Sequence, residues 1–284
     1  MNLEKLLAWK FNELEHTLHP RDAILYALGI GIGAAADDPQ ELQFTYEKGL
    51  KVFPSWVNVI AHPGGWIMAP ELEVEWVKLL HGEQSFRIER PLEAGKTYVG
   101  RYRIRDVLDK GPGKGALLYL EKQLFEKDSQ ALAAVVTSTY FLRGDGGCGG
   151  TTEVADPVHA IPDRPADRTV TLTTLPQSAL IYRLSGDLNP IHADPVLARK
   201  AGFERPILHG LCTLGVATRA VLAAGCDNRP EALASLQLRF SAPVYPGETL
   251  VTEFWDDEGA VSFRSRVAER DLIVLNNGRA TFVC

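Results

Sequence analysis

The chain contains two blocks in which apolar and polar residues alternate, interspersed with stretches whose apolar residues have helical spacing. Alternation with a period of two predicts half-buried strands, and Gly, Pro or charged residues close each of them. The predicted strands are residues 85–89, 97–108, 116–126 and 132–142 in the first block, and 169–175, 233–242, 249–256, 261–269 and 272–283 in the second.

Helical spacing accounts for most of the remaining chain. The predicted helices are residues 21–29, 54–61, 177–184, 194–201 and 211–224. Residues 1–19 carry Glu4, Glu13 and Glu15 among apolar positions, which predicts an amphipathic surface helix rather than a signal or transit peptide.

The two blocks repeat one plan. Pro-x-x-x-Gly-x-Thr occurs at residues 91–97 and again at 243–249, each time between the first two long strands, and Tyr26 aligns with Tyr182 in the helices upstream. One long helix against four or five antiparallel strands is the hotdog arrangement. The sequence therefore predicts an α+β double hotdog, with two antiparallel sheets each wrapped on a central helix.

Residues 144–168 are rich in Gly, Pro and Asp and poor in apolar residues, which is typical of a linker. We place the boundary there, between an N-terminal hotdog at residues 1–143 and a C-terminal hotdog at residues 169–284. A chain of 284 residues, of which 45% are hydrophobic, is long enough for both units to bury a core.

The net charge of −6 argues against nucleic-acid binding, which needs a basic face, so any phosphate contact must be local. No apolar run is long enough to cross a bilayer, because Arg219 interrupts the apolar helix at 211–224, and membrane insertion is not expected. The last four residues form no peroxisomal address, so we expect a cytoplasmic protein.

Neither a disulfide framework nor a metal site is predicted. The near pair His16 and His19 lacks an acidic or cysteine partner at ligand spacing. Four cysteines without C-x-x-C spacing fit a reducing compartment. They are Cys148, Cys212, Cys226 and Cys284.

The chemically richest stretch runs from Tyr182 to Gly210. Asp187 and His192 lie five residues apart around Asn189-Pro190, and the proline ends the preceding helix in a turn. A carboxylate and an imidazole brought to one point can hold a water, take its proton and return one elsewhere. On spacing alone, a structural histidine and an aspartate bonded to its own turn would explain the pair equally well.

The full string resembles the hydratase 2 motif of the MaoC-like family of (R)-specific enoyl-CoA hydratases. That motif is an aromatic, then Leu, Ser, Gly, Asp, any residue, Asn, Pro, an aliphatic residue, His, and Ala six residues later. Every place is filled, by Tyr182, Leu184, Ser185, Gly186, Asp187, Asn189, Pro190, Ile191, His192 and Ala198. Residues 80–84, 106–111 and 243–247 extend the resemblance toward the hydratase unit of peroxisomal multifunctional enzyme type 2.

This resemblance implies reversible hydration of a trans-2-enoyl-CoA to a (3R)-3-hydroxyacyl-CoA in fatty acyl-CoA metabolism. The addition of water requires no redox cofactor, and coenzyme A is part of the substrate. The resemblance also implies a homodimer. It also implies substrate or coenzyme A contacts at His81, Gly82, Lys110 and Phe240. Lys110 lies in a Gly-rich turn, where an ammonium group and mobile backbone could meet phosphates.

Asp187 and His192 would share the acid–base work, and their roles are interchangeable at this stage. Asn189 is expected to pin the turn and orient Asp187. Gly210 opens the long helix, where backbone N–H groups lack intrahelical acceptors, so its N–H is the candidate oxyanion donor, as the resemblance also implies. We expect its neighbour His209 to be structural.

Extending the alignment of Tyr26 with Tyr182 matches Gly31 to Asp187 and Ala36 to His192. The first copy therefore lacks both the carboxylate and the imidazole. Its small residues and shortened central helix would leave room for an acyl chain. Two alternatives stay open, a hotdog acyl-CoA thioesterase and an acyl-CoA-binding protein without turnover. Acyl chain length, a sterol side-chain preference and pathway direction have no sequence signal.

Overall fold

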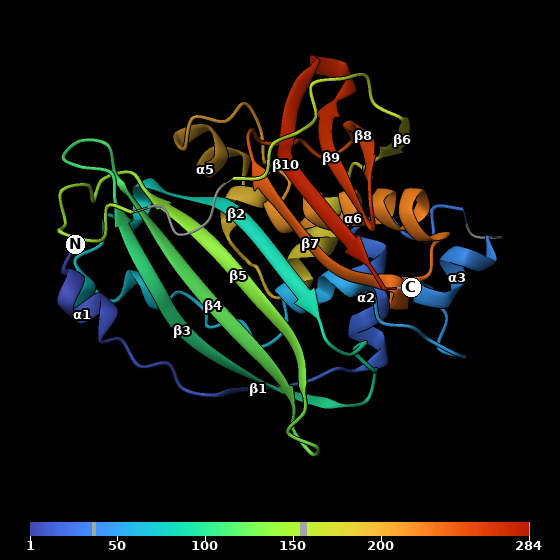
Figure 1. The fold of residues 1–284 in the computed structure, drawn as a ribbon, viewed down its shortest axis with the longest axis horizontal. Coiled ribbons are helices and arrows are strands. Elements are labelled where there is room, and N and C mark those ends of the chain that lie inside the picture. The colour runs from blue at the N-terminus through green and yellow to red at the C-terminus, as the bar shows by residue number, and fades with distance from the viewer. Residues whose placement is uncertain (36–37, 154–157, 284) are drawn as a thin grey trace.

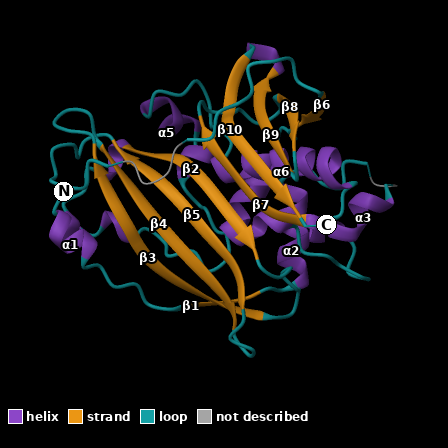
Figure 2. Cartoon of the chain, in the orientation of Figure 1, coloured by secondary structure: helices purple, strands orange, loops and turns teal. Residues whose placement is uncertain are grey.

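The computed structural model describes residues 1–35, 38–153 and 158–283, and its strands form one antiparallel sheet (Figures 1 and 2). The strand order is β1-β3-β4-β5-β2-β7-β10-β9-β8-β6, so each repeat contributes half of the sheet and the halves meet where β2 pairs with β7. The strands are β1 Leu14–Thr17, β2 Leu79–Ile88, β3 Thr97–Asp109, β4 Ala116–Glu126, β5 Leu132–Leu142, β6 Arg168–Thr173, β7 Leu233–Phe240, β8 Thr249–Asp257, β9 Ala260–Val267 and β10 Leu272–Phe282.

The helices α2 and α6 lie on one face of this sheet, behind it in Figure 1. The α-helices are α1 Leu3–Leu7, α2 Pro20–Gly29, α3 Pro39–Thr45, α4 Ser178–Tyr182, α5 Pro195–Lys200 and α6 Gly210–Cys226. Because α6 is apolar around most of its circumference, it is buried along most of its length. The predicted α+β double hotdog is confirmed, with the refinement that the two sheets join edge to edge.

A local two-fold relation organises the molecule. Ser85 in β2 pairs with Gln237 in β7, and these two residues are as far apart in sequence as Pro91 and Pro243 of the repeated motif. A residue that pairs with its own counterpart in an antiparallel ladder lies on a two-fold axis. Residues of both repeats pack into one hydrophobic core across this axis, so the predicted units share their interior.

The repeats differ in their central helix. The second repeat has the 17-residue α6, whereas the corresponding part of the first repeat has a five-residue 3₁₀ helix, Pro54–Asn58. The helix predicted at 54–61 is therefore shorter than expected. Its proline starts the turn, and Ala61 has a positive φ of 50°, which a continuing helix would not allow.

The helix predicted over residues 1–19 is wrong. Only α1 is helical there, and β1 pairs with β3 through Leu14↔Gly100 and Thr17↔Thr97. The sequence 14–17 alternates between half-buried and exposed positions, which is strand periodicity. Pairing with the free edge of β3 supplies backbone hydrogen bonds that outweigh the weak helical propensity of a short segment.

The first part of the predicted linker is not loose. Thr151 forms a parallel bridge with Leu108 of β3, and its hydroxyl donates to the Asp106 carboxylate (2.9 Å). Residues 144–151 therefore pack on the first repeat before the chain crosses to β6. Residues 154–157 of the linker lie outside the described part of the chain.

One buried lysine holds the shortened helix of the first repeat. Lys122 of β4 is only 2% exposed, and its ammonium group donates to the carbonyl oxygens of Val57 (2.6 Å), Asn58 (3.3 Å) and Ile60 (2.8 Å). Buried carbonyl groups that lose their donors retain the full cost of desolvation. Lys122 thus replaces, for this segment, hydrogen bonds that a longer helix would have provided.

We predict that Lys122→Met lowers the free energy of unfolding by about 2–4 kcal/mol, because methionine fills similar volume but donates to none of the three carbonyls. Urea denaturation monitored by circular dichroism measures the change. Lys127→Met is the matched control, since Lys127 is exposed and pairs only with Glu15 (2.7 Å), and it should change stability by less than about 0.5 kcal/mol. An unchanged midpoint for Lys122→Met would contradict the assignment.

Candidate active site

The loop that follows α4 is shaped by its own side chains. Gly186 adopts a φ of 123°, which favours glycine, and it ends the 3₁₀ turn Arg183–Ser185. Asp187 Oδ1 accepts a hydrogen bond from the Asn189 N–H (3.1 Å), and Asn189 Oδ1 accepts one from the Ile191 N–H (3.1 Å). Two successive Asx turns therefore fix the backbone between the acid and the imidazole.

The structure places Asn189 as the cap of the turn Pro190–His192. Its backbone N–H, rather than its side chain, contacts the Asp187 carboxylate. An orienting role for Asn189 is thus consistent with the geometry, and it acts through the peptide conformation that its side chain stabilises.

His192 has a defined tautomer. Its Nδ1–H donates to the carbonyl oxygen of Ile207 (2.9 Å), which leaves the Nε2 lone pair free to accept a proton. Burial lowers the pKa of His192, although the Ile207 carbonyl and the charge of Asp187 oppose that shift. At neutral pH the ring is therefore an uncharged base.

Asp187 and His192 converge on one point together with His209. One oxygen or nitrogen atom from each of the three side chains lies within 4.8 Å of the others. A single water forming two hydrogen bonds of about 2.8 Å can bridge such a separation. The acid and the imidazole that the sequence singled out can thus hold the same solvent molecule.

This cluster has the composition of a metal site but not the orientation of one. The rings of His192 and His209 are stacked, with centroids 3.6 Å apart and planes at 27°. An imidazole lone pair lies in the plane of its ring, so stacked rings direct their lone pairs side by side and not toward a shared ion. We interpret the cluster as acid–base chemistry.

Gly210 brings a backbone donor to the same place. It is the first residue of α6, and its N–H donates to no residue in the part of the chain that the structure describes. The ring of Phe240 lies against Gly210, so that a side-chain carbon there would stand 3.3 Å from the ring. Phe240 in turn contacts the ring of His81 edge to face, at 5.0 Å.

His81 is held by a chain of polar contacts within the first repeat. Its Nε2–H donates to Gln84 Oε1 (2.8 Å), which also accepts from the Ser138 hydroxyl (2.8 Å). Gln84 Nε2 donates to Asn58 Oδ1 (2.7 Å), which fixes the orientation of the amide. Burial lowers the pKa of His81 to about 4, so the ring is neutral.

The structure does not bring Gly82 and Lys110 into this cluster. Gly82 lies at a bulge in β2, where a side-chain carbon would stand 3.3 Å from the Thr139 carbonyl oxygen. The Lys110 ammonium group lies over the ring of Phe141 at 5.1 Å, at the end of the sheet where His81 also lies.

The turn that carries Lys110 is better fixed than the sequence indicated. The neighbouring Asp109 carboxylate accepts three backbone N–H groups at 2.7–2.9 Å, and these hydrogen bonds lower its pKa. The donors are Gly111, Gly147 and Gly149. These hydrogen bonds anchor one end of the Lys110 turn.

Sequence reasoning missed two titratable groups of the first repeat that lie within reach of the charge of Asp187. Burial lowers the pKa of His62, burial raises the pKa of Tyr140, and the charge of Asp187 acts on both. The His62-Pro63-Gly64-Gly65 segment carried only a loop signal, and Tyr140 lies in a strand whose periodicity explained it fully. The contacts of His209 with Asp187 and His192 were also missed, because they arise only from the fold.

The first repeat has no comparable pair among its described residues. Asp38 caps α3 and Asp194 caps α5, and the two are as far apart in sequence as Tyr26 and Tyr182, which supports the alignment of Gly31 with the acid. Ala36, aligned with the histidine, lies outside the described residues.

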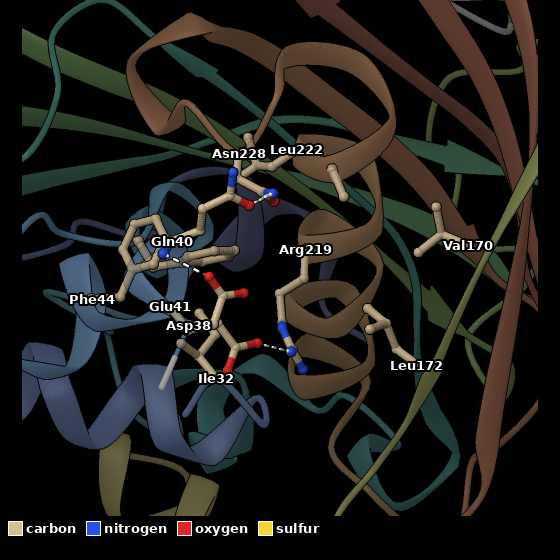
Figure 3. Close-up of a pocket in the computed structure, with 12 residues that line it drawn as sticks. Ile32, Asp38, Gln40, Glu41, Phe44, Val170, Leu172, Arg219, Leu222 and Asn228 are labelled. Carbon is tan, nitrogen blue, oxygen red and sulfur yellow. Dashed lines mark hydrogen bonds and ion pairs between the residues drawn. The ribbon is translucent and has the colours of Figure 1, made fainter. Parts of the chain in front are cut away.

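An ion pair occupies the position that corresponds to the acid. Arg219 of α6 donates to the Ile30 carbonyl (3.1 Å) and pairs with Glu41 (2.7 Å), which also accepts from the Gly33 N–H (2.7 Å). A side-chain carbon on Gly31 would lie 3.0 Å from the Arg219 guanidinium. Figure 3 shows Arg219 directed at Glu41, beside a pocket of about 170 Å³. In the first repeat this position therefore has a structural role.

The part of the chain that the structure describes contains no helix that could span a membrane. Cys148, Cys212 and Cys226 are free thiols, and Cys284 lies outside the described residues.

Two family models match consecutive parts of the chain. The MFE-2 hydratase 2 N-terminal domain matches residues 16–144, and the MaoC like domain matches residues 157–277. These matches coincide with the two repeats.

Relatives extend over nearly the whole chain. "Enoyl-CoA hydratase 2, peroxisomal" from Arabidopsis thaliana is 37% identical, over 96% of this chain and 93% of its own. "3-hydroxyacyl-thioester dehydratase Y" from Mycobacterium tuberculosis is 39% identical, over 93% of this chain and 92% of its own. Mouse "Peroxisomal multifunctional enzyme type 2" is 36% identical over 92% of this chain but only 36% of its own length.

A solved structure of a MaoC-like dehydratase from Phytophthora capsici superposes with a TM-score of 0.85 at 34% identity, covering 100% of this chain and 99% of its own. Full-length peroxisomal multifunctional enzyme type 2 from Drosophila melanogaster gives a TM-score of 0.81 at 35% identity, over 95% of this chain and 48% of its own. Since both repeats match and relatives above 30% identity align along almost its full length, the chain belongs to the MaoC-like hydratase 2 family.

Proposed function

We propose that this protein hydrates trans-2-enoyl-CoA reversibly to (3R)-3-hydroxyacyl-CoA in fatty acyl-CoA metabolism. The observation that carries the proposal is the convergence of Asp187 and His192 within the span of one water, beside the Gly210 N–H. The membership of the family supports the substrate class and the stereochemistry of the product. No cofactor is required, because adding water changes no oxidation state overall.

Each group has a step in the reaction. His192 Nε2 accepts a proton from the water as its oxygen bonds to C3 of the acyl group, and the Asp187 carboxylate orients that water. Electron density moves to the thioester oxygen, where the Gly210 N–H and the N-terminus of α6 stabilise it. The proton held by His192 passes to the Asp187 carboxylate, which delivers it to C2, so that OH is added at C3 and H at C2 and both side chains return to their starting charge.

We expect Asp187→Asn and His192→Gln each to reduce hydration by roughly 10²–10⁴-fold, because each removes a proton-transfer group. The loss of enoyl absorbance with crotonyl-CoA measures the rate. Asp271→Asn and His159→Gln, which lie away from the cluster, are matched controls and should retain activity.

Wild-type turnover in either catalytic variant would refute the mechanism. Release of free coenzyme A, detected with a thiol reagent, in place of hydration would instead identify a thioesterase. Binding of crotonyl-CoA with neither reaction would identify a binding protein.

We also propose that the first repeat accommodates the acyl chain. A pocket of about 600 Å³ lies beside the shortened helix Pro54–Asn58, where the second repeat has α6. Its walls include Leu50, Val57, Ile88 and Ala94, and Ile88 is in the same strand as His81 of the candidate site. Coenzyme A would then lie toward His81, Gly82, Phe240 and Lys110 at the opposite end of β2.

Ala94→Trp should shorten the accepted chain. Ala94 is partly exposed at the pocket, so the indole fills space that a long acyl chain would use. Displacing two methylenes costs about 1.6 kcal/mol, so kcat/KM for hexadecenoyl-CoA should fall roughly tenfold or more, while that for crotonyl-CoA is unchanged. Ala131→Trp, in the turn between β4 and β5, is the control. An equal effect on both substrates would contradict the placement.

A homodimer is the assembly that we propose. Leucines on α4 and the catalytic loop are exposed, by 55% at Leu180, 59% at Leu184 and 60% at Leu188, which is unusual for large apolar side chains that lie so close together in sequence. Light scattering coupled to gel filtration should report a dimer, and Leu184→Glu should weaken it. A monomeric wild-type protein would end this proposal.

We propose a cytoplasmic location on the basis of the free thiols, which fit a reducing compartment. The relative from Arabidopsis thaliana is named peroxisomal, so the peroxisome is the alternative location. Fractionation of cells with an antibody against the protein distinguishes the two.

A further inference from the structure

His209 contacts both catalytic residues, the backbone of Asp187 and the ring of His192. Its Nε2–H donates to the backbone carbonyl of Asp187 (3.1 Å), while the His192 Nδ1–H donates to the backbone carbonyl of Ile207 (2.9 Å). Each imidazole therefore bonds to the segment that carries the other. The two rings stack at 3.6 Å between these crossed hydrogen bonds.

The position of His209 in the chain adds a third connection. It is the N-cap of α6 and precedes Gly210, whose N–H faces the substrate in the proposed mechanism. Its other neighbour is the ring of Tyr182, with centroids 5.0 Å apart. With 2% of its surface exposed, the ring is confined between Tyr182 and His192. A shift of His209 would thus move the acid, the base and the oxyanion donor relative to one another.

The charge state of His209 matters as well. Because Nε2 carries the hydrogen, the neutral ring has its lone pair on Nδ1, which is buried without a hydrogen-bond partner among the described residues. Burial, together with the neighbouring His192 and Arg183, lowers the pKa of His209 to about 4, against the charge of Asp187 and the hydrogen bond to its backbone carbonyl. An uncharged ring leaves the stacked His192 able to accept a proton, which a cation at this distance would oppose.

We propose that His209 is a positioning residue for hydration, holding the Asp187 carboxylate and the His192 ring in a fixed relation to the Gly210 N–H. This inference rests on the proposed function. His209 acts through other groups, since its hydrogen bond goes to a backbone oxygen and its ring to a neighbouring ring. It therefore differs from the plain structural role that the sequence suggested.

Two amide variants test which nitrogen matters. Glutamine places its N–H₂ group near the position of imidazole Nε2, whereas asparagine places it near Nδ1. His209→Gln should retain the bond to the Asp187 carbonyl, and His209→Asn should lose it. We expect kcat to fall by roughly 10–100-fold in His209→Asn, because small misplacements of reacting groups have effects of that order, and to be partly restored in His209→Gln.

The split between binding and turnover separates positioning from general damage. KM for crotonyl-CoA, and the affinity for the unreactive butyryl-CoA, should stay within about threefold of the wild-type values in both variants, because His209 contacts neither the acyl chain nor coenzyme A in the proposed mode. His159→Gln is the matched control, a partly buried histidine of the linker whose Nε2 bonds to the Ser262 hydroxyl of the second repeat (2.9 Å).

A folded His209→Asn with wild-type kcat would overturn the proposal, as would equal kcat in the two variants or better turnover in His209→Asn. If His209→Asn does not fold, His209→Gln with KM unchanged and kcat reduced less than tenfold supports it, and His209→Gln with KM and kcat both impaired tenfold or more overturns it. Failure of the wild-type protein to hydrate crotonyl-CoA would refute the proposed function itself, independently of the variants.

Discussion

Two hydrogen bonds between imidazoles and peptide carbonyls determine the geometry on which the site depends. One joins His192 to Ile207 and the other joins His209 to Asp187, and together they lock the loop after α4 to the segment before α6. Either bond alone would allow the two segments to pivot. Because they cross, with the rings stacked between them, the acid, the base and the first N–H of α6 are held as one unit.

The duplication explains why only one such unit exists. Both repeats have a helix, a glycine-containing turn and a second capped helix in the same order, yet the first repeat has an Arg219–Glu41 ion pair where the second has its carboxylate. That arginine comes from α6, the central helix of the other repeat. In the first repeat, the position of the reactive carboxylate is thus taken by a contact that joins the two halves of the molecule.

Without a long helix, backbone carbonyl groups of the first repeat lack intrahelical donors, and buried side chains donate to them instead. Lys122 satisfies three carbonyls at the end of the short 3₁₀ helix, and Gln84 links Asn58 of that helix to His81 beside the site. These bonds let the segment end early without leaving peptide groups unpaired. Pro54 and Val57 of this short helix line the pocket next to β2 that we propose for the acyl chain.

The sequence by itself determined the repeat, the strands and the chemical pair. Strand alternation is a local property, so β4 and β5 were predicted to the residue. The motif singled out Asp187 and His192 because its spacing is short and its residue types are particular, and the start of the predicted long helix singled out Gly210. The features that only the tertiary structure decided depend on contacts between residues that are far apart in the sequence. The edge strand β1 forms because β3 offers it hydrogen bonds, although its own sequence suggested a helix. Folding stacks His209 on His192, and it brings Gly147 and Gly149 to the Asp109 carboxylate beside Lys110. Such contacts join residues far apart in the chain, and no local periodicity or spacing records them.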